Sequence, residues 1–103
     1  MVRAKFSIGQ VVTHGLYGYR GIIIDADPVF SLSNDWYERM AQTRPAKEQP
    51  WYHILVHNSD IQTYVAEHSL TAEQQTLDVT NPHIESYFRK RERQQYDTQR
   101  MMS

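Results

Sequence analysis

The chain has 103 residues, of which 40% are hydrophobic, and a formal net charge of −1. This length suits one domain with one modest core. The absence of cysteine excludes disulfides, thiolate nucleophiles and cysteine-ligated zinc. No apolar run approaches the roughly 20 residues that span a bilayer, and no secretory apolar segment follows residues 1–5. We therefore expect a soluble, cytoplasmic protein.

The small net charge hides a segregated distribution. Residues 1–24 carry only basic charged side chains, residues 25–88 are mainly acidic, and residues 89–103 are again mainly basic. Basic ends attract either a polyanion or the acidic middle of a neighbouring subunit. The net charge of the chain is nevertheless not strongly positive, as it is in a typical autonomous DNA-binding domain.

Two apolar segments, residues 6–14 and 19–25, flank a glycine-tyrosine turn. Their β-branched side chains favour a pleated, half-buried surface. Between them, Gly15 and Gly18 supply the backbone freedom of a tight reversal. This pattern predicts a β-hairpin, and a small β domain that opens in this way binds partners more often than it catalyses reactions.

A long connection, residues 28–50, follows the hairpin. Pro28 ends the second strand because proline removes a ladder donor. Within the connection, residues 33–35 offer a helix N-cap before about two turns of helix over residues 36–41. In so small a domain, a connection of this length is typical of a functional or docking segment.

Further strands are predicted over residues 51–57 and 61–66, joined by a turn at residues 57–60. Residues 67–70 then form either a short closing strand or a single helical turn. Together these elements predict a mainly β protein with a small SH3-like, partly open five-stranded barrel. Alternation along the third strand places Tyr52 on the buried face, and leaves Trp51 and His53 as the better candidates for an exposed site.

The last predicted element is a C-terminal α-helix. Asn81 is a plausible N-cap with proline at the first helical position, and Ile84, Tyr87 and Phe88 form one stripe. This stripe docks on the barrel, on a neighbouring subunit or on a partner, and the sequence does not separate these alternatives. The predicted organisation is a barrel over residues 1–80, a helix over residues 81–97 and a disordered tail over residues 98–103.

Four blocks of sequence resemble the HspQ heat-shock protein family, also called the hemimethylated-DNA-binding, YccV-like family. The first block reads F-x-I-G-Q-V-V-x-H-x-L-x-G-Y-R-G-I-I-I-D over residues 6–25. The others are D-P-V-F-S-L-S (27–33), P-W-Y-H-I-L-V (50–56) and T-Y-V-A-E-H-S-L (63–70). The resemblance is close over residues 6–70 and looser beyond. The turn at residues 57–60 is shorter than the acidic connection usual in the family.

The resemblance implies a bacterial cytoplasmic stress protein with an SH3-like barrel. Family members are described as binding hemimethylated DNA, and also as assisting ATP-dependent proteolysis with the Lon protease. Self-association, for example as a trimer, would also fit the family. The resemblance therefore leaves two alternative functions open. The protein is either a non-enzymatic adaptor that promotes degradation of selected or misfolded proteins, or a DNA-binding protein that prefers hemimethylated DNA.

The residues themselves favour binding over catalysis. The five histidines lack metal-site spacing, and His53 and His57 lie about 13 Å apart along a strand. No serine has a nucleophile motif around it. We therefore expect no enzyme activity, catalytic residue, metal or cofactor.

Three sets of candidate binding residues follow. Aromatic side chains near a barrel rim suit a peptide, while basic side chains suit phosphates. The predicted protein-binding residues are Trp36, Tyr37, Trp51 and His53. The predicted DNA-binding residues are Arg3, Lys5, Arg20, Arg89, Lys90, Arg91 and Arg93, with the first three expected at one end of the hairpin. The predicted oligomer or helix-docking residues are Ile84, Tyr87 and Phe88.

Overall fold

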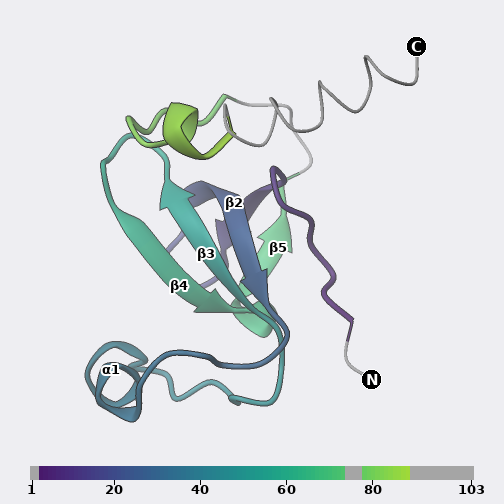
Figure 1. The fold of residues 1–103 in the computed structure, drawn as a ribbon, viewed down its shortest axis with the longest axis vertical. Coiled ribbons are helices and arrows are strands. Elements are labelled where there is room, and N and C mark those ends of the chain that lie inside the picture. The colour runs from purple at the N-terminus through teal and green to yellow at the C-terminus, as the bar shows by residue number, and fades with distance from the viewer. Residues whose placement is uncertain (1–2, 74–77, 89–103) are drawn as a thin grey trace.

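The computed structural model describes residues 3–73 and 78–88. Its strands form one antiparallel sheet in the order β4-β3-β2-β1-β5 (Figure 1). They are β1 (Val11–His14), β2 (Arg20–Asp27), β3 (Trp51–Val56), β4 (Gln62–Ala66) and β5 (Leu70–Ala72), with helix α1 (Asn34–Met40) and the 3-10 helix η1 (Glu67–Ser69). The predicted mainly β class is confirmed.

The predicted hairpin is formed by β1 and β2. His14 N–H donates to the Tyr19 carbonyl at 2.8 Å, and Gly18 adopts φ +75°, which a residue without Cβ accepts readily. Gly21 is required for a different reason. A Cβ at this position would lie 2.8 Å from the Leu55 carbonyl oxygen and overlap the Ile54 side chain, so β2 and β3 approach closely only because Gly21 has no side chain.

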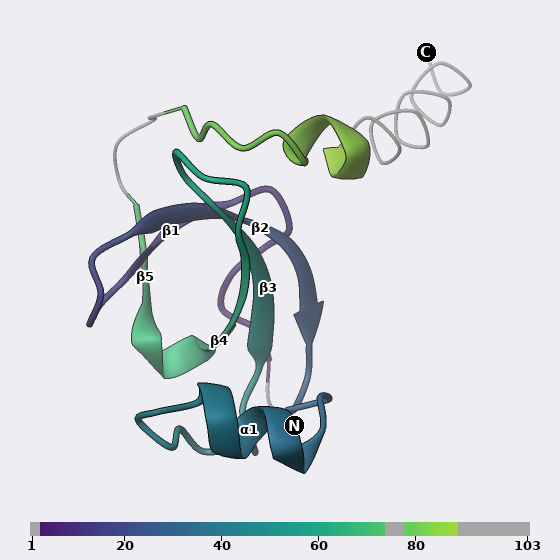
Figure 2. The same cartoon turned by 90° about the vertical axis from the view of Figure 1, so that its left-hand side faces the viewer.

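The sheet is strongly curled (Figure 2). Its two edge strands are β4 and β5, which follow each other in the chain. After β4, the 3-10 helix η1 redirects the chain, and β5 then pairs with β1. Residues 67–72 therefore contain a helical turn followed by a strand. The two alternatives left open by the sequence both occur, one after the other.

The main core lies on the inner face of this curved sheet. Tyr52 is 0% exposed, as predicted, and Phe6 packs on it with ring centroids 5.5 Å apart. The Tyr52 hydroxyl donates to Glu67 Oε2 at 2.7 Å and accepts from the Phe6 N–H at 3.2 Å, so its polar end is satisfied. The buried residues of this core are Val12, Ile23, Tyr52, Ile54, Val65 and Leu70.

Helix α1 lies at the end of the sheet where β3 begins and β4 ends, and it packs on Trp51, Tyr64 and Ala66 (Figures 1 and 2). Of the residues 33–35 predicted to hold the cap, Ser33 is the N-cap, and its Oγ accepts from the Trp36 N–H at 3.1 Å. The helix therefore begins at Asn34, two residues earlier than predicted. Tyr37 faces the sheet and is buried. Trp51 is consequently only 1% exposed, and the prediction that it is exposed is wrong. Alternation separates two faces of a strand, but at the start of β3 the rings of Phe30, Trp36 and Tyr37 cover the second face as well.

The segment after β5 returns to the turn between β3 and β4. Asn81 Nδ2 donates to the carbonyls of Val56 (3.0 Å) and Ile61 (3.3 Å), while Asn81 Oδ1 accepts from the His83 N–H at 2.9 Å. Residues 84–88 are helical. The helix therefore begins at residue 84 and not near residue 81 as predicted, while its predicted part beyond residue 88 and the tail over residues 98–103 lie outside the described residues.

The helical residues 84–88 contact their own chain. The Tyr87 hydroxyl donates to Gln62 Oε1 at 3.3 Å, and Phe88 lies beside Gly9. Ile84 and Phe88 are half-buried, whereas Tyr87 is exposed. The division into barrel, helix and tail stays a prediction. A role of Ile84, Tyr87 and Phe88 in forming an oligomer also stays a prediction.

Candidate binding groove

A cluster of aromatic rings lies between α1 and the outer face of the sheet. Trp51 stacks on Tyr64 with ring centroids 5.2 Å apart, and Trp36 meets Tyr64 edge-on at 5.5 Å. Phe30 contacts Trp51 at 5.0 Å and Tyr37 at 5.4 Å. Such offset and edge-to-face pairs are favourable beyond the area that they bury. The cluster therefore fixes α1 against β3 and β4.

Polar groups anchor Tyr64 within the cluster. Its hydroxyl donates to Asp27 Oδ2 at 2.7 Å and accepts from the Ser31 N–H at 3.1 Å. Burial, followed by the hydrogen bond to Asp27, raises the pKa of Tyr64 to about 12. Asp27 Oδ2 also lies 3.3 Å from His53 Nε2. The centroids of the His53 and Tyr64 rings are 4.5 Å apart. Tyr64 therefore stays protonated and oriented at neutral pH.

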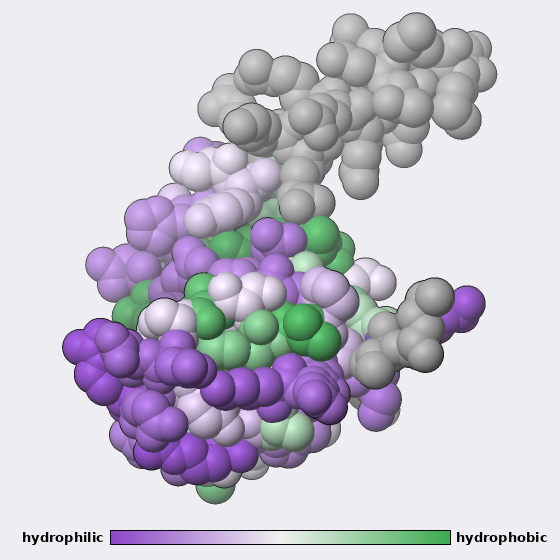
Figure 3. Space-filling view, turned by 60° about the horizontal axis from the view of Figure 1, so that its bottom comes forward, coloured by the Kyte–Doolittle hydropathy of each residue, from purple (hydrophilic) through white to green (hydrophobic). Residues whose placement is uncertain are grey.

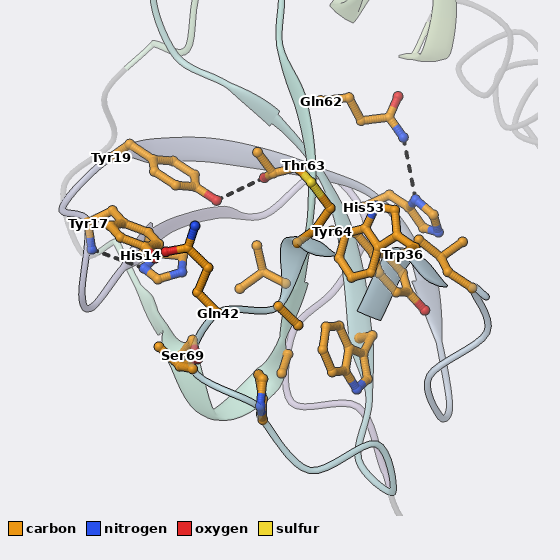
Figure 4. A pocket seen from close by; sticks show the side chains of 18 of the residues that line it. His14, Tyr17, Tyr19, Trp36, Gln42, His53, Gln62, Thr63, Tyr64 and Ser69 are labelled. Carbon is orange, nitrogen blue, oxygen red and sulfur yellow. Dashed lines mark hydrogen bonds between the residues drawn. The ribbon is translucent and has the colours of Figure 1, made fainter. Parts of the chain in front are cut away.

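A groove of about 510 Å³ opens beside this cluster. Figure 4 shows Trp36, Tyr64 and His53 on one side of it and Tyr17, Tyr19 and His14 on the other, with Thr63 between. The volume lies within the range of small-ligand pockets. The complete lining is His14, Tyr17, Tyr19, Leu32, Trp36, Met40, Ala41, Gln42, Thr43, Pro45, Trp51, His53, Ile61, Gln62, Thr63, Tyr64, Val65, Ala66 and Ser69.

The second wall comes from the β1–β2 turn. His14 Nδ1 accepts hydrogen bonds from the N–H groups of Leu16 (3.1 Å) and Tyr17 (3.2 Å). Burial lowers the pKa of His14, which agrees with an unprotonated Nδ1. The Tyr19 hydroxyl bonds Thr63 Oγ1 at 2.8 Å, and burial raises the pKa of Tyr19. This wall is thus joined directly to β4.

The groove lining contains no aspartate, glutamate, lysine or arginine. In the whole chain, by contrast, 22% of residues are charged. Met40 is 62% exposed at its rim, and Leu32, Tyr17 and Ile61 are exposed apolar neighbours. In Figure 3, a hydrophobic patch lies between bands of hydrophilic residues on the side where the connection between β2 and β3 comes forward. The groove therefore favours an uncharged occupant, because burying an unpaired charge is costly.

The four predicted protein-binding residues come together in and behind this wall. Trp36 and His53 are half-buried and line the groove, while Trp51 also lines it but is almost fully buried. Tyr37 lies behind the lining, where its hydroxyl donates to the Pro45 carbonyl at 2.7 Å. Trp36 and His53 therefore present contact surface, whereas Trp51 and Tyr37 support it.

The predicted DNA-binding residues are not brought together. Lys5 N–H donates to Glu67 Oε2, next to the start of β3, whereas the Arg20 carbonyl accepts from the His57 N–H beyond the end of β3. A strand of six residues spans about 20 Å, so the expectation that these two share one end is wrong. Arg3 and Lys5 are exposed and Arg20 is half-buried. Arg89, Lys90, Arg91 and Arg93 lie outside the described residues.

The described residues hold neither a cluster of metal-ligating side chains nor a helix that could span a membrane. Residues 3–73 and 78–88 contain no group of three or more histidine, aspartate or glutamate side chains placed to hold a metal ion. In the same part of the chain, no helix is both long and apolar enough to cross a bilayer.

Sequence reasoning missed the groove itself and the central position of Tyr64. The signal for the aromatic wall was present, because Phe30, Trp36 and Tyr37 stand in a long connection where loop residues are normally polar. The aromatic wall faces His14 and Tyr19 only because the sheet curls. The local pattern of residues in a strand does not determine the curvature of the whole sheet.

The fold and groove define a class: a small antiparallel β domain with an uncharged, aromatic-lined groove. A family model described as "Hemimethylated DNA-binding protein YccV like" matches residues 4–95. The chain therefore belongs to the YccV-like family, as the sequence blocks indicated.

Proposed function

We propose that this protein is a non-enzymatic adaptor that promotes degradation of selected or misfolded proteins by an ATP-dependent Lon-type protease. The observation that supports this proposal is the groove, whose aromatic lining carries no charged carboxylate, ammonium or guanidinium group. Misfolded proteins expose apolar segments, and those segments suit such a surface. The adaptor acts through binding free energy, and no bond is made or broken on it.

On this proposal the domain is an SH3-like, partly open barrel in the bacterial cytoplasm, and its open side between β4 and β5 carries the groove. Self-association, for example as a trimer, would place several grooves on one particle. Multiple weak sites raise avidity for one client while each site still releases it. Analytical ultracentrifugation of the full chain measures the mass that this part of the proposal requires.

A second function, preference for hemimethylated DNA, is favoured by the description of the family. The exposed Arg3 and Lys5 side chains are available for phosphate contacts at one end of the sheet. Such contacts are salt-dependent and independent of sequence. Recognition of a methyl group on one strand would need apolar contact with a base edge as well.

One experiment separates the two functions. A Lon substrate is incubated with purified protease and ATP, with and without this protein, and the same preparation is titrated with hemimethylated and fully methylated duplexes. We expect faster proteolysis, together with weak DNA binding that ignores methylation. Unchanged proteolysis with a clear preference for the hemimethylated duplex would establish the DNA function instead.

A matched pair of variants ties the effect to the groove. Met40→Asp places a charge at the exposed rim of the groove, whereas Asn34→Asp places the same charge at the other end of α1, outside the lining. We expect the stimulation of proteolysis to fall at least fivefold with Met40→Asp and to stay near the wild-type level with Asn34→Asp. Equal stimulation by both variants would place client binding elsewhere on the protein.

A further inference from the structure

The hydrogen-bond pattern between β3 and β4 fixes which way each backbone group of β4 points. Val56 N–H donates to the Ile61 carbonyl at 3.0 Å, and Glu67 N–H donates to the Pro50 carbonyl at 2.9 Å. In an antiparallel ladder, hydrogen-bonded residues alternate with residues whose backbone groups point outward. The odd-numbered residues from 61 to 67 therefore bond β3.

The even-numbered residues of β4 consequently direct their N–H and C=O groups away from the sheet. β4 is an edge strand, and within the described part of the chain no hydrogen bond reaches the backbone groups of Gln62 or Tyr64. Gln62 is exposed, so its outward groups are open to a partner. An edge of this kind is a template for one more strand.

The groove follows this same edge. All residues from 61 to 66 line it, one wall lying over each face of the edge strand (Figure 4). Trp36 and His53 stand on the α1 side, and Tyr19 and His14 stand on the inner side. Successive side chains of a strand point to opposite faces. A strand added to β4 would therefore direct alternate side chains against the two walls.

We propose that the groove binds a short, extended, uncharged peptide segment by strand addition to the free edge of β4. This inference rests on the proposed adaptor function, and it names the feature of a client that the adaptor recognises. The outward N–H and C=O groups of the exposed Gln62 supply main-chain hydrogen bonds, and the aromatic walls receive the side chains. Affinity and selectivity then have separate sources, as in other cases of strand addition.

The absence of charged side chains in the lining favours an uncharged peptide over a nucleic acid strand or a charged peptide. The lining offers no cation for a phosphate or carboxylate and no carboxylate for a lysine or arginine. A nucleic acid strand or a charged peptide would therefore lose its solvation without gaining a partner. An uncharged segment keeps its backbone satisfied by pairing with β4, so an unfolded stretch of β-branched and aromatic residues fits best.

The first test uses a fluorescein-labelled seven-residue peptide of alternating valine and threonine with a central phenylalanine. The control is the same peptide with N-methyl groups on its three central amides, which keeps the side chains but blocks main-chain pairing. Fluorescence anisotropy with the full-length protein measures both affinities. We expect binding of the first peptide and at least tenfold weaker binding of the second. Equal affinities would show that side chains alone are recognised and would overturn strand addition.

The second test changes the protein at one backbone atom. Gln62→Pro removes the outward N–H, which an edge strand tolerates because that group does not bond the neighbouring strand. Gln62→Ala removes the side chain, with its contacts to His53 and Tyr87, but keeps the N–H. We expect Gln62→Pro to weaken peptide binding at least fivefold more than Gln62→Ala does, because only the proline variant lacks the N–H. The reverse order would overturn the assignment. If Gln62→Pro does not fold, the N-methylated peptide decides alone.

Proteolysis assays with the same variants separate this inference from the proposed function. Peptide binding that depends on Gln62 N–H without any stimulation of the protease supports the site and contradicts the adaptor function. Stimulation that Gln62→Pro leaves unchanged supports the adaptor and overturns the site. If the peptide fails to bind and Gln62→Pro instead lowers the oligomer mass, the edge pairs with a second copy, and the peptide proposal is wrong.

Discussion

His14 shows how one side chain supports a turn by remaining uncharged. Its Nδ1 accepts two backbone hydrogen bonds from the β1–β2 turn, and its ring packs against Tyr17 and Tyr19 at centroid distances of 4.7 and 5.2 Å. A proton on Nδ1 would turn this acceptor into a donor facing two other donors. The turn, and with it one wall of the groove, therefore depends on neutral imidazole.

We expect the free energy of unfolding to fall as the pH drops below the ordinary histidine pKa of 6.5. Burial lowers the pKa of His14 in the folded state, so below pH 6.5 the unfolded chain binds a proton that the folded chain refuses. Urea unfolding at pH 7 and pH 5 measures the loss. His14→Asn keeps a local acceptor without titrating and should reduce the dependence, whereas His83→Asn, at an exposed position, should not. Identical pH profiles for the three proteins would contradict this assignment.

At the scale of elements, α1 is short and depends on its surroundings. An isolated helix of seven residues is unstable in water, so its order comes from the Ser33 cap and from the packing of Tyr37 on the sheet. Because α1 carries Trp36 and Met40, the stability of this helix controls one wall of the groove.

We expect Ser33→Ala to lower the free energy of unfolding by about 1 kcal/mol, the usual contribution of an N-cap side chain. The matched control is Ser31→Ala in the same connection. Ser31 is exposed and its hydroxyl donates to the Val29 carbonyl rather than to a helix N–H, so its loss should have a smaller effect. Urea denaturation of both variants gives the comparison, and equal losses would show that the cap does not stabilise α1.

Elements with a local cause were predictable from sequence, and contacts between distant elements were not. The Ser33 cap and the hairpin glycines each follow from side-chain chemistry within a few residues. The burial of Trp51 required knowing that α1 packs against the start of β3. Likewise, the separation of Lys5 from Arg20 depends on the path of the N-terminal segment toward η1, which no local pattern fixes.

At the scale of the whole molecule, two buried tyrosines tie distant segments to the sheet. Tyr52 holds the N-terminal segment and η1 through Phe6 and Glu67. Tyr64 holds the strand end at Asp27 and the start of the long connection. Burial first, and then the hydrogen bonds to carboxylates, raise the pKa of each tyrosine to about 12.

We expect the free energy of unfolding to be unaffected by these tyrosines below pH 10 and to fall between pH 10 and 12. In that window the unfolded chain releases phenolic protons that the folded chain retains, and the equilibrium shifts toward unfolding. Chemical denaturation at pH 9 and pH 11 tests this. Replacing Tyr52 and Tyr64 together by phenylalanine should make the alkaline slope shallower, and Tyr19, whose pKa is also raised by burial, should keep part of it.

The closure of the sheet also determines how the chain can fold. β1 pairs with β5, almost 60 residues later, and the β3–β4 turn is bonded by Asn81. The first strand therefore emerges from a ribosome long before its partner and cannot complete its pairing until nearly the whole domain has been made. Such distant pairings place folding in the range of milliseconds to seconds, typical of small β domains. During that interval the nascent chain itself exposes the kind of uncharged apolar segment that the finished groove is proposed to bind.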